Sequence, residues 1–459
     1  MSKNSIITLE IENWGPVAKG NITFKPLTVF IGPNNTGKSY IAMLYYALIK
    51  ALRYTSPRGI YYASTPSEIP IIKSKGIIPV TLYTIHKKSI MKKIGETTSQ
   101  VCLLARANPK KGKQKLHELI YELLLETQSQ LNKDIKARAS ALIKREIERI
   151  FSSKVADLIR FGTPNATVKL RLSGKLADIL CHISISAKGK ANISLEFSVS
   201  DNALHKRIES IINNISPTLK HLSGLDSKNP QAVQLTSRLE RQIFEHLDNL
   251  IKEYISDVLS LLKDIHYLPA SRAGILHSYR TVARAIISIA PLAPIRGTEI
   301  PKIPGPIADF LSNLIEISPE EKEIQEPYTH ISKQLEQEIL EGEVRLMKGT
   351  PETPPTLVYK PDDYEIPIAR TSSMIAETAP LALYLKYGII EEGDTVIIEE
   401  PEAHLHPDKQ AKLAELLAYL INKLNIRIII TTHSDILLAK LSNLVSLSAL
   451  PPEEIKKLG

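Results

Sequence analysis

The sequence predicts an α/β fold built around a phosphate-binding loop. The first observation is the pattern G-x-x-x-x-G-K-S at 32–39, which lies between a short apolar run at 27–31 and a helical pattern at 39–54. The second is a strand-like run at 394–398, apolar over its last three residues and followed by consecutive acids, and the third is a run at 427–430 that is followed by Thr-Thr-His-Ser. Continuous apolar runs of this length are typical of strands buried on both faces, and open α/β sheets bind ligands at the carboxyl ends of such strands.

The loop is a candidate phosphate cradle. Its glycines let successive backbone N–H groups approach an anion, and the N-terminus of the following helix favours negative charge. Lys38 would add a positive charge near the γ-phosphate, and the Ser39 hydroxyl suits Mg²⁺. A chance glycine turn containing a lysine would not explain the flanking strand and helix. The expected nucleotide-binding residues are Gly32, Pro33, Asn34, Asn35, Thr36, Gly37, Lys38 and Ser39.

Two alternating runs precede the loop. Residues 6–11 and 21–24 alternate apolar and polar side chains around the turn 13–16, so they predict two antiparallel strands. Trp14 in this turn could stack on a base or ligand, but a lone tryptophan beside a turn is more often packed in the core. We therefore expect a core position for Trp14.

The chain is expected to have three parts. Residues 1–55 form the N-terminal part of the nucleotide-binding domain, and 56–264 form a mainly helical insertion with a small β-unit. Residues 265–459 complete the domain with the acids and the histidine. Prolines and glycines between 56 and 79 mark the first boundary.

Within the insertion, helical patterns cover 117–130 and 134–151, and alternating runs between 168 and 199 predict a small antiparallel unit. Residues 231–264 repeat apolar side chains every three or four positions, which is typical of one limb of a helical arm. After the insertion, helical patterns at 307–317 and 328–341 and strands at 343–346, 356–359 and 365–368 are expected.

The charge balance weakly favours a polyanionic partner. The net charge is +9 and the pI is near 9.1. Cations without interleaved aromatic residues suit contact with the phosphate backbone of DNA, whereas acids at helical spacing beside them would equally suit a solvated surface. The basic residues concerned are Lys87, Lys88, Lys92, Lys93, Lys110, Lys111, Lys113, Lys115, Lys136, Arg138, Lys144, Arg145 and Arg149.

The composition bears on the cellular location of the protein and on metal binding. Cys102 and Cys181 form no C-x-x-C pair, which disfavours a structural zinc site and a secreted disulfide scaffold. Without an apolar signal core or an apolar run of about 18 residues, we expect a cytoplasmic location and no membrane partner. His404 and His406 lack an evident third ligand, so we interpret them as interface residues.

The acids after 398 form the second half of the predicted site. Glu399 is the candidate Mg²⁺ ligand, and Glu400 is the candidate base that accepts a proton from the attacking water. His433 follows the third strand and is expected to hydrogen-bond the γ-phosphate or that water. The alternative for the acids is a charged strand end facing solvent. Arg272 could bind a phosphate, a neighbouring subunit or a backbone carbonyl, and the sequence leaves this open.

The motifs at 28–39, 398–407 and 432–434 together resemble the ABC-type P-loop ATPases, most closely the SMC, RecF and OLD-like branch of AAA-family ATPases. The resemblance implies an ABC-ATPase head with an antiparallel β subdomain and an inserted helical arm. It also implies ATP and Mg²⁺ as ligands and two heads that sandwich ATP. The loop that would complete the partner's site is 371–377, with Ser372 and Ser373 as its contacts.

Three features depart from the family pattern. Met374 stands where glycine is usual, Glu399 replaces the usual aspartate, and no residue matches the glutamine loop. The chain stops soon after His433 without a TOPRIM-type nuclease domain, so a nuclease would be a separate polypeptide.

The sequence therefore predicts a slow, Mg²⁺-dependent ATPase (ATP + H₂O to ADP + phosphate) that forms a homodimer through ATP. Its expected role is a switch acting on DNA or on a partner effector, as in DNA repair or anti-phage defence. The alternative function is an ATP-clamped scaffold that recruits a nuclease or toxin with little hydrolysis. A transporter ATPase is disfavoured because the insertion at 56–264 has no place in a compact transport head.

Overall fold

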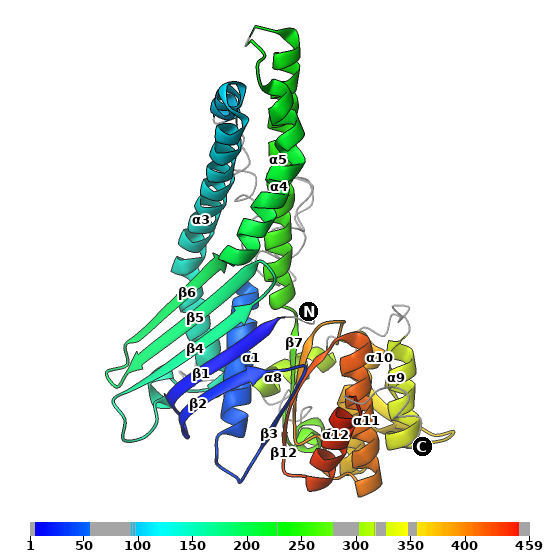
Figure 1. Cartoon of the computed structure of the whole chain (residues 1–459). Helices are drawn as coiled ribbons and strands as arrows, with labels where there is room; N and C mark the ends of the chain where they lie inside the picture. Colours follow the sequence, from blue (N-terminus) through cyan, green and yellow to red (C-terminus); the bar gives the residue numbers. More distant parts are fainter. Residues whose placement is uncertain are drawn as a thin grey trace, which may run out of the picture.

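The structure is a computed structural model, and it combines a parallel and an antiparallel sheet with a projecting helical arm (Figure 1). The predicted α/β class is confirmed. The residues that the structure describes are 5–55, 93, 95–96, 98–226, 228–278, 303–315, 317, 327–347 and 356–448.

Four parallel strands form the sheet that carries the predicted site. Their order is β3 (Leu27–Ile31), β12 (Arg427–Thr432), β11 (Thr395–Glu399) and β7 (Ile265–Leu268). Neighbouring residues of β11 face opposite cores: Ile397 packs in one hydrophobic cluster, while Val396 and Ile398 pack in the other. The central residues of the strands are mostly apolar because both faces of the sheet are covered.

The second sheet is antiparallel and has the strand order β2-β1-β4-β5-β6. The β-unit expected inside the insertion is not separate, because β4 pairs with β1 with Leu170 opposite Leu9. Strands from both sides of the domain boundary predicted at residue 56 therefore belong to one sheet. The strands are β1 (Ile6–Trp14), β2 (Val17–Phe24), β4 (Asn165–Ser173), β5 (Ala177–Ser186) and β6 (Ala191–Val199).

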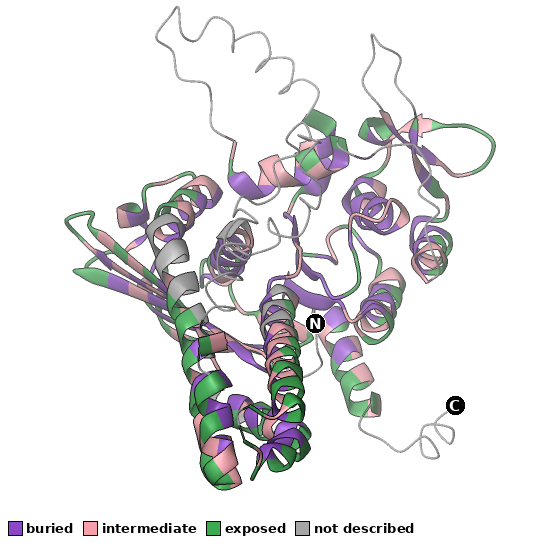
Figure 2. Ribbon diagram, turned by 90° about the horizontal axis from the view of Figure 1, so that it is seen from above, coloured by how far each residue is buried: buried purple, intermediate pink, exposed green. Residues whose placement is uncertain are grey.

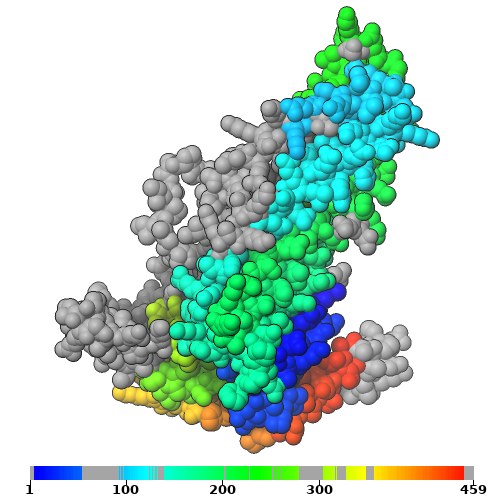
Figure 3. Space-filling model, turned by 90° about the vertical axis from the view of Figure 1, so that its left-hand side faces the viewer, coloured from blue at the N-terminus to red at the C-terminus, as the bar shows by residue number. Residues whose placement is uncertain are grey.

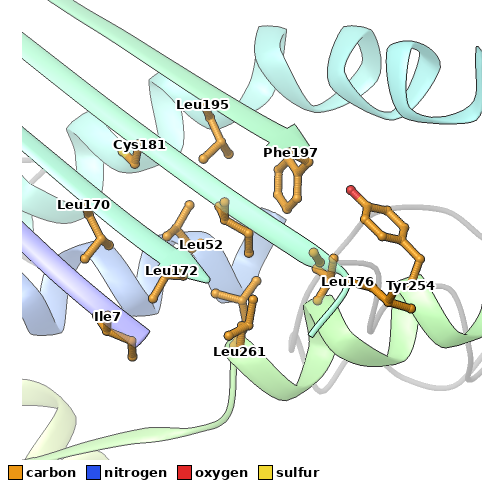
Figure 4. Packing of buried hydrophobic residues seen from close by; sticks show 14 of the residues in the cluster. Ile7, Leu52, Leu170, Leu172, Leu176, Cys181, Leu195, Phe197, Tyr254 and Leu261 are labelled. Carbon is orange, nitrogen blue, oxygen red and sulfur yellow. The ribbon is translucent and has the colours of Figure 1, made fainter. Parts of the chain in front are cut away.

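Helix α1 (Lys38–Thr55) begins at the phosphate-binding loop and is buried along most of its length. Its Tyr45 ring stacks on Phe24 of β2 with the ring centroids 4.1 Å apart. Figure 4 shows Leu52 of α1 among Leu170, Leu172 and Leu261, which come from β4 and from the base of the arm. The loop is therefore anchored to the core by the helix that follows it.

Three helices form the arm: α3 (Pro109–Phe151), α4 (Asp201–Leu222) and α5 (Pro230–Leu261). Helix α4 packs against both α3 and α5, and the arm projects away from the sheets (Figure 3). The limb predicted at 231–264 is confirmed. The two patterns at 117–130 and 134–151 belong to one helix, which starts at Pro109 after the N-cap Asn108.

Most of the remaining elements cover the far face of the parallel sheet around a second core, and Figure 2 colours their buried residues purple along the ribbon. None of the helices in the described ranges is long and apolar enough to cross a membrane. These elements are α8 (Gly305–Ile315), α9 (Tyr328–Leu335), η3 (Glu336–Leu340), β8 (Glu343–Met347), β9 (Thr356–Lys360), β10 (Ile366–Pro367), η4 (Ile368–Arg370), α10 (Ser373–Lys386), α11 (Pro407–Leu424) and α12 (Asp435–Ser448). The short helix η2 (Val155–Leu158) packs in the first core instead.

Candidate functional site

The predicted phosphate loop joins β3 to α1, and its backbone requires glycine. Gly32 has a φ of 146° and Gly37 a φ of 97°, a region that side chains with a Cβ rarely adopt. A Cβ on Gly37 would also lie 2.6 Å from Cγ2 of Val17. The turn between β1 and β2 therefore packs directly against the phosphate-binding loop at Gly37 and leaves no room there for a side chain.

The Lys38 side chain lies over the loop. Its Nζ donates hydrogen bonds of 2.8 Å to the carbonyl oxygens of Gly32 and Pro33. Thr36 closes the turn through a 2.9 Å hydrogen bond from Oγ1 to the Pro33 carbonyl. The side chains of Asn34, Asn35, Thr36 and Ser39 are exposed, so the face of the loop is open to solvent.

The sheet brings the three predicted motifs to one edge. Ile31, just before the loop, pairs with Thr432 on β12, and Thr431 pairs with Glu399 on β11. Since all three strands are parallel, their carboxyl ends coincide, and one strand separates the loop from the acids. With strands about 4.8 Å apart, the loop strand and the acid strand lie roughly 10 Å from each other.

Glu399 and Glu400 differ sharply in environment. Glu399 is 9% exposed, and its Oε2 accepts a 3.2 Å hydrogen bond from the Ala270 N–H. Burial, reinforced by the Glu399 charge, raises the pKa of the Tyr267 phenol well above its usual value, so this neighbour stays neutral. Glu400 is exposed and has a φ of 44°. One acid is thus held inside the strand end, and the other is directed to solvent.

Glu402 connects the ends of β11 and β12, and the sequence interpretation missed it. Its Oε1 accepts hydrogen bonds from the Thr432 hydroxyl at 2.7 Å and from the His433 N–H at 2.9 Å. The Thr432 Oγ1 in turn accepts a 2.9 Å hydrogen bond from the Ser434 N–H. The His433 side chain is exposed on this edge. The sequence signal that could have indicated Glu402 is its position as the third acid after Ile398.

The structure settles the contacts of Arg272. The guanidinium is buried, and its Nη1 donates to the carbonyl oxygens of Pro269 at 3.0 Å and Glu399 at 2.8 Å. Of the three roles that the sequence left open for Arg272, the structure shows binding to backbone carbonyls. Burial lowers the pKa of Arg272 from its ordinary value, and the charges of Glu377 and Glu399 oppose that shift.

Ser372 and Ser373 lie away from the loop motifs in the chain, at the start of α10. Both side chains are exposed, and the Ser372 Oγ accepts a 3.4 Å hydrogen bond from the Ile375 N–H as the helix cap. Met374 is partly buried against the second core. Their predicted contact with a partner's nucleotide stays a prediction.

Other sequence expectations have clear positions. Trp14 is fully buried and meets Phe151 edge-on, which confirms the core interpretation. His404 and His406 are exposed, and the described part of the chain holds no group of three or more His, Cys, Asp or Glu suited to a metal. Both cysteines are buried free thiols.

The basic residues divide between exposed and paired positions. Lys110 and Lys111 are exposed near the start of α3, whereas the partly buried Arg149 is paired with Glu146 and Asp309. Lys87, Lys88 and Lys92 lie outside the described residues, as do the side chains of Lys136 and Arg138.

Comparison with known families decides the broad assignment. The family model of the AAA ATPase domain matches residues 5–438, almost the whole chain. The chain belongs to this AAA ATPase domain family. The match confirms the P-loop ATPase expected from the motifs, and the phosphate loop, acids and histidine of this AAA ATPase chain all fall within the matched region. No curated protein matches the chain.

Solved structures similar to the AAA ATPase chain include three SMC heads. An SMC head bound to the C-winged helix domain of ScpA is 13% identical, with a TM-score of 0.40, covering 95% of this chain and 92% of that one. The SMC head domain from Thermotoga maritima is 11% identical (TM-score 0.35; 95% and 91% covered). The head with an extended coiled coil bound to a ScpA domain from Pyrococcus furiosus is 12% identical (TM-score 0.36; 95% and 92%).

Proposed function

We propose that this chain is a Mg²⁺-dependent ATPase that dimerises around ATP and moves its helical arm as it hydrolyses the nucleotide. The observation that carries the proposal is the common sheet edge, on which the loop after β3, the acids after β11 and His433 after β12 lie in adjacent register. Membership of the AAA ATPase domain family supports the same activity.

The residues present suit a magnesium triphosphate. The open face of the loop offers backbone N–H groups and the Lys38 ammonium, which can leave the Gly32 and Pro33 carbonyls for phosphate oxygens. The Ser39 hydroxyl and the Glu399 carboxylate would hold Mg²⁺, whose charge would neutralise the phosphate oxygens.

Glu400 is the proposed general base. An attacking water forms a bond to the γ-phosphorus, the bond to the leaving ADP oxygen breaks, and the Glu400 carboxylate takes the proton of the water. His433 would donate a hydrogen bond to the γ-phosphate or the water, while Glu402 holds its backbone N–H. The direct test is Mg²⁺-dependent phosphate release from ATP. A rate equal to background, with and without EDTA, would contradict the proposal.

The proposed dimer places Ser372 and Ser373 against the γ-phosphate bound by the partner subunit. Their exposure at the start of α10, a 14-residue helix, supports this arrangement. Light scattering should report a dimer with ATP in Glu400→Gln, which retains ATP, and a monomer in Lys38→Ala. A monomer under all conditions would contradict the sandwich.

The exposed lysines of the arm support DNA as a partner. We expect duplex binding to weaken steeply between low and high salt, with a shallower slope in the Lys110→Glu/Lys111→Glu variant, because each lost phosphate contact reduces the slope by about 0.9. A flat salt response would remove DNA from the proposal. The cytoplasmic location and the role in repair or anti-phage defence stay predictions.

The second candidate is a static ATP clamp that recruits a separate nuclease or toxin. Met374 favours it, because a partly buried side chain occupies the position where the related heads have glycine. An ATP-induced dimer of the wild-type chain that persists for many hours without phosphate release would support the clamp over the switch.

A further inference from the structure

Arg272 and Glu377 form a buried ion pair that joins the acid-bearing strand end to helix α10. The side chains are 2% and 3% exposed, and Nε of Arg272 lies 3.1 Å from Oε2 of Glu377. Nε also donates a 2.8 Å hydrogen bond to the Glu377 carbonyl. A pair so enclosed has one stable geometry, because breaking it would leave an uncompensated charge inside the protein.

Glu377 is anchored by backbone donors as well. Its two carboxylate oxygens accept 3.1 Å hydrogen bonds from the N–H groups of Arg272 and Ala273. Glu377 lies one turn into α10, four residues after the first helical residue, Ser373. The N-terminus of α10 is therefore fixed rigidly to the segment that follows β7.

The other side of Arg272 holds the backbone around Glu400. Nη1 donates to the Glu399 carbonyl at 2.8 Å, and Nη2 lies 3.5 Å from the Glu400 carbonyl. Glu400 has left-handed backbone geometry, which is strained for a residue with a Cβ. The guanidinium thus holds both carbonyls beside the strained residue whose backbone direction sets the direction of its side chain.

We propose that Arg272 and Glu377 are positioning residues that direct the Glu400 carboxylate and link its direction to the N-terminus of α10. The inference rests on the proposed function, in which Glu400 is the base and α10 meets the partner's nucleotide. A displacement of α10 on dimerisation reaches the Glu399–Glu400 peptide through a single buried side chain. Hydrolysis in one site then responds to the occupancy of the other.

The test compares Arg272→Lys and Glu377→Gln with a matched control, Glu336→Gln. Glu336 is a buried acid outside α10. It lies 3.0 Å from Nζ of Lys386, at the C-terminal end of α10, and it accepts a 2.9 Å hydrogen bond from the Val344 N–H. Lysine at 272 keeps the charge but cannot reproduce the planar fork of arginine. Turnover, nucleotide dissociation constant, ATP-induced dimer fraction and Tm are measured for each variant.

We expect kcat to fall about 10- to 100-fold in both test variants, since a displacement of about 1 Å in a reacting group has this effect. The dissociation constant for ATP should stay within about twofold, and the Hill coefficient for ATP should fall toward one. Glu336→Gln should lower Tm by about as much as the two test variants do. Its kcat should nevertheless stay within about twofold of wild type.

Equal kcat values in Glu377→Gln and Glu336→Gln, with active wild type, would overturn the positioning role alone. Loss of nucleotide affinity in parallel with kcat would overturn it as well. If one test variant does not fold, the other decides, because each removes a different partner of the same pair. Wild-type turnover no faster than that of Glu400→Gln would instead defeat the proposed function, and the inference with it.

Discussion

The carboxylate of Glu402 accepts a 2.7 Å hydrogen bond from the hydroxyl of Thr432, and this bond ties the loop that follows β11 to the last residue of β12, where the next loop begins. The same oxygen accepts the His433 N–H, so a single carboxylate sets the spacing between the acids and the histidine. Both loops lie at the sheet edge where the phosphate-binding loop begins.

Thr432→Val should therefore lower turnover without weakening nucleotide binding. Valine keeps the shape of the strand end but removes the donor to Glu402, so the His433 backbone loses part of its support. We expect kcat to fall about tenfold, because about 1.4 kcal/mol of barrier is tenfold in rate and a hydrogen bond to a charged group contributes about 1.5–3 kcal/mol. Thr431→Val, the same change one residue earlier, is the control, and equal rates in the two variants would contradict this role.

Lys38→Met should weaken ATP binding while leaving the fold intact. Among the described residues, the ammonium bonds to the Gly32 and Pro33 carbonyls of its own loop, so its loss costs little stability, whereas a charge-assisted bond to phosphate is worth about 1.5–3 kcal/mol. Isothermal titration should show affinity at least about tenfold weaker. Lys19→Met, an exposed lysine on β2, is the control. Unchanged affinity in Lys38→Met would show that nucleotide binds elsewhere.

Asp309 of α8 gives a prediction about stability and pH. It accepts hydrogen bonds from Arg149 at 2.6 and 3.0 Å and from Tyr46 at 2.9 Å, and it lies 2.5 Å from Lys50, so it joins the arm to α1. Burial pushes the pKa of Asp309 upward, but Arg149 and Lys50 outweigh it and hold the pKa below its usual value. Asp309→Asn should lower the free energy of unfolding by about 3 kcal/mol at pH 7.

Because the folded-state pKa of Asp309 is depressed, its contribution is fully present above the unfolded-state value of about 3.9 and is lost as the pH falls through the folded value. The stability difference between wild type and Asp309→Asn should thus shrink below about pH 4. Denaturant titrations across this range test it, with exposed Asp362→Asn as the control. A difference that stays constant down to pH 2 would exclude the ion-pair explanation.

The sequence predicted the parts of the fold that depend on local pattern. The loop at 32–39, the strands that precede and oppose it and the arm limb at 231–264 all have strong local signals, and each lies where it was expected. The division of α3 near 131–133 was wrong, because a polar stretch does not end a helix that neighbouring helices support.

Non-local contacts could not be predicted from the pattern. The pairing of Leu9 with Leu170 joins strands far apart in the chain, so the β-unit was assigned to the insertion. Glu377 and Arg272 are 105 residues apart, and nothing in either local sequence indicates the other. For the same reason the hydrogen bond between Thr432 and Glu402 was not foreseen.

The central claim is that Glu400 takes a proton from water beside a nucleotide held by the loop at 32–39. Single-turnover hydrolysis of ATP by wild type and by Glu400→Gln tests it most directly, with the exposed Glu391→Gln as the control. We predict that ATP binds all three equally, that Glu391→Gln matches wild type, and that Glu400→Gln hydrolyses ATP at least about 100-fold more slowly. Equal rates in wild type and Glu400→Gln would contradict the account.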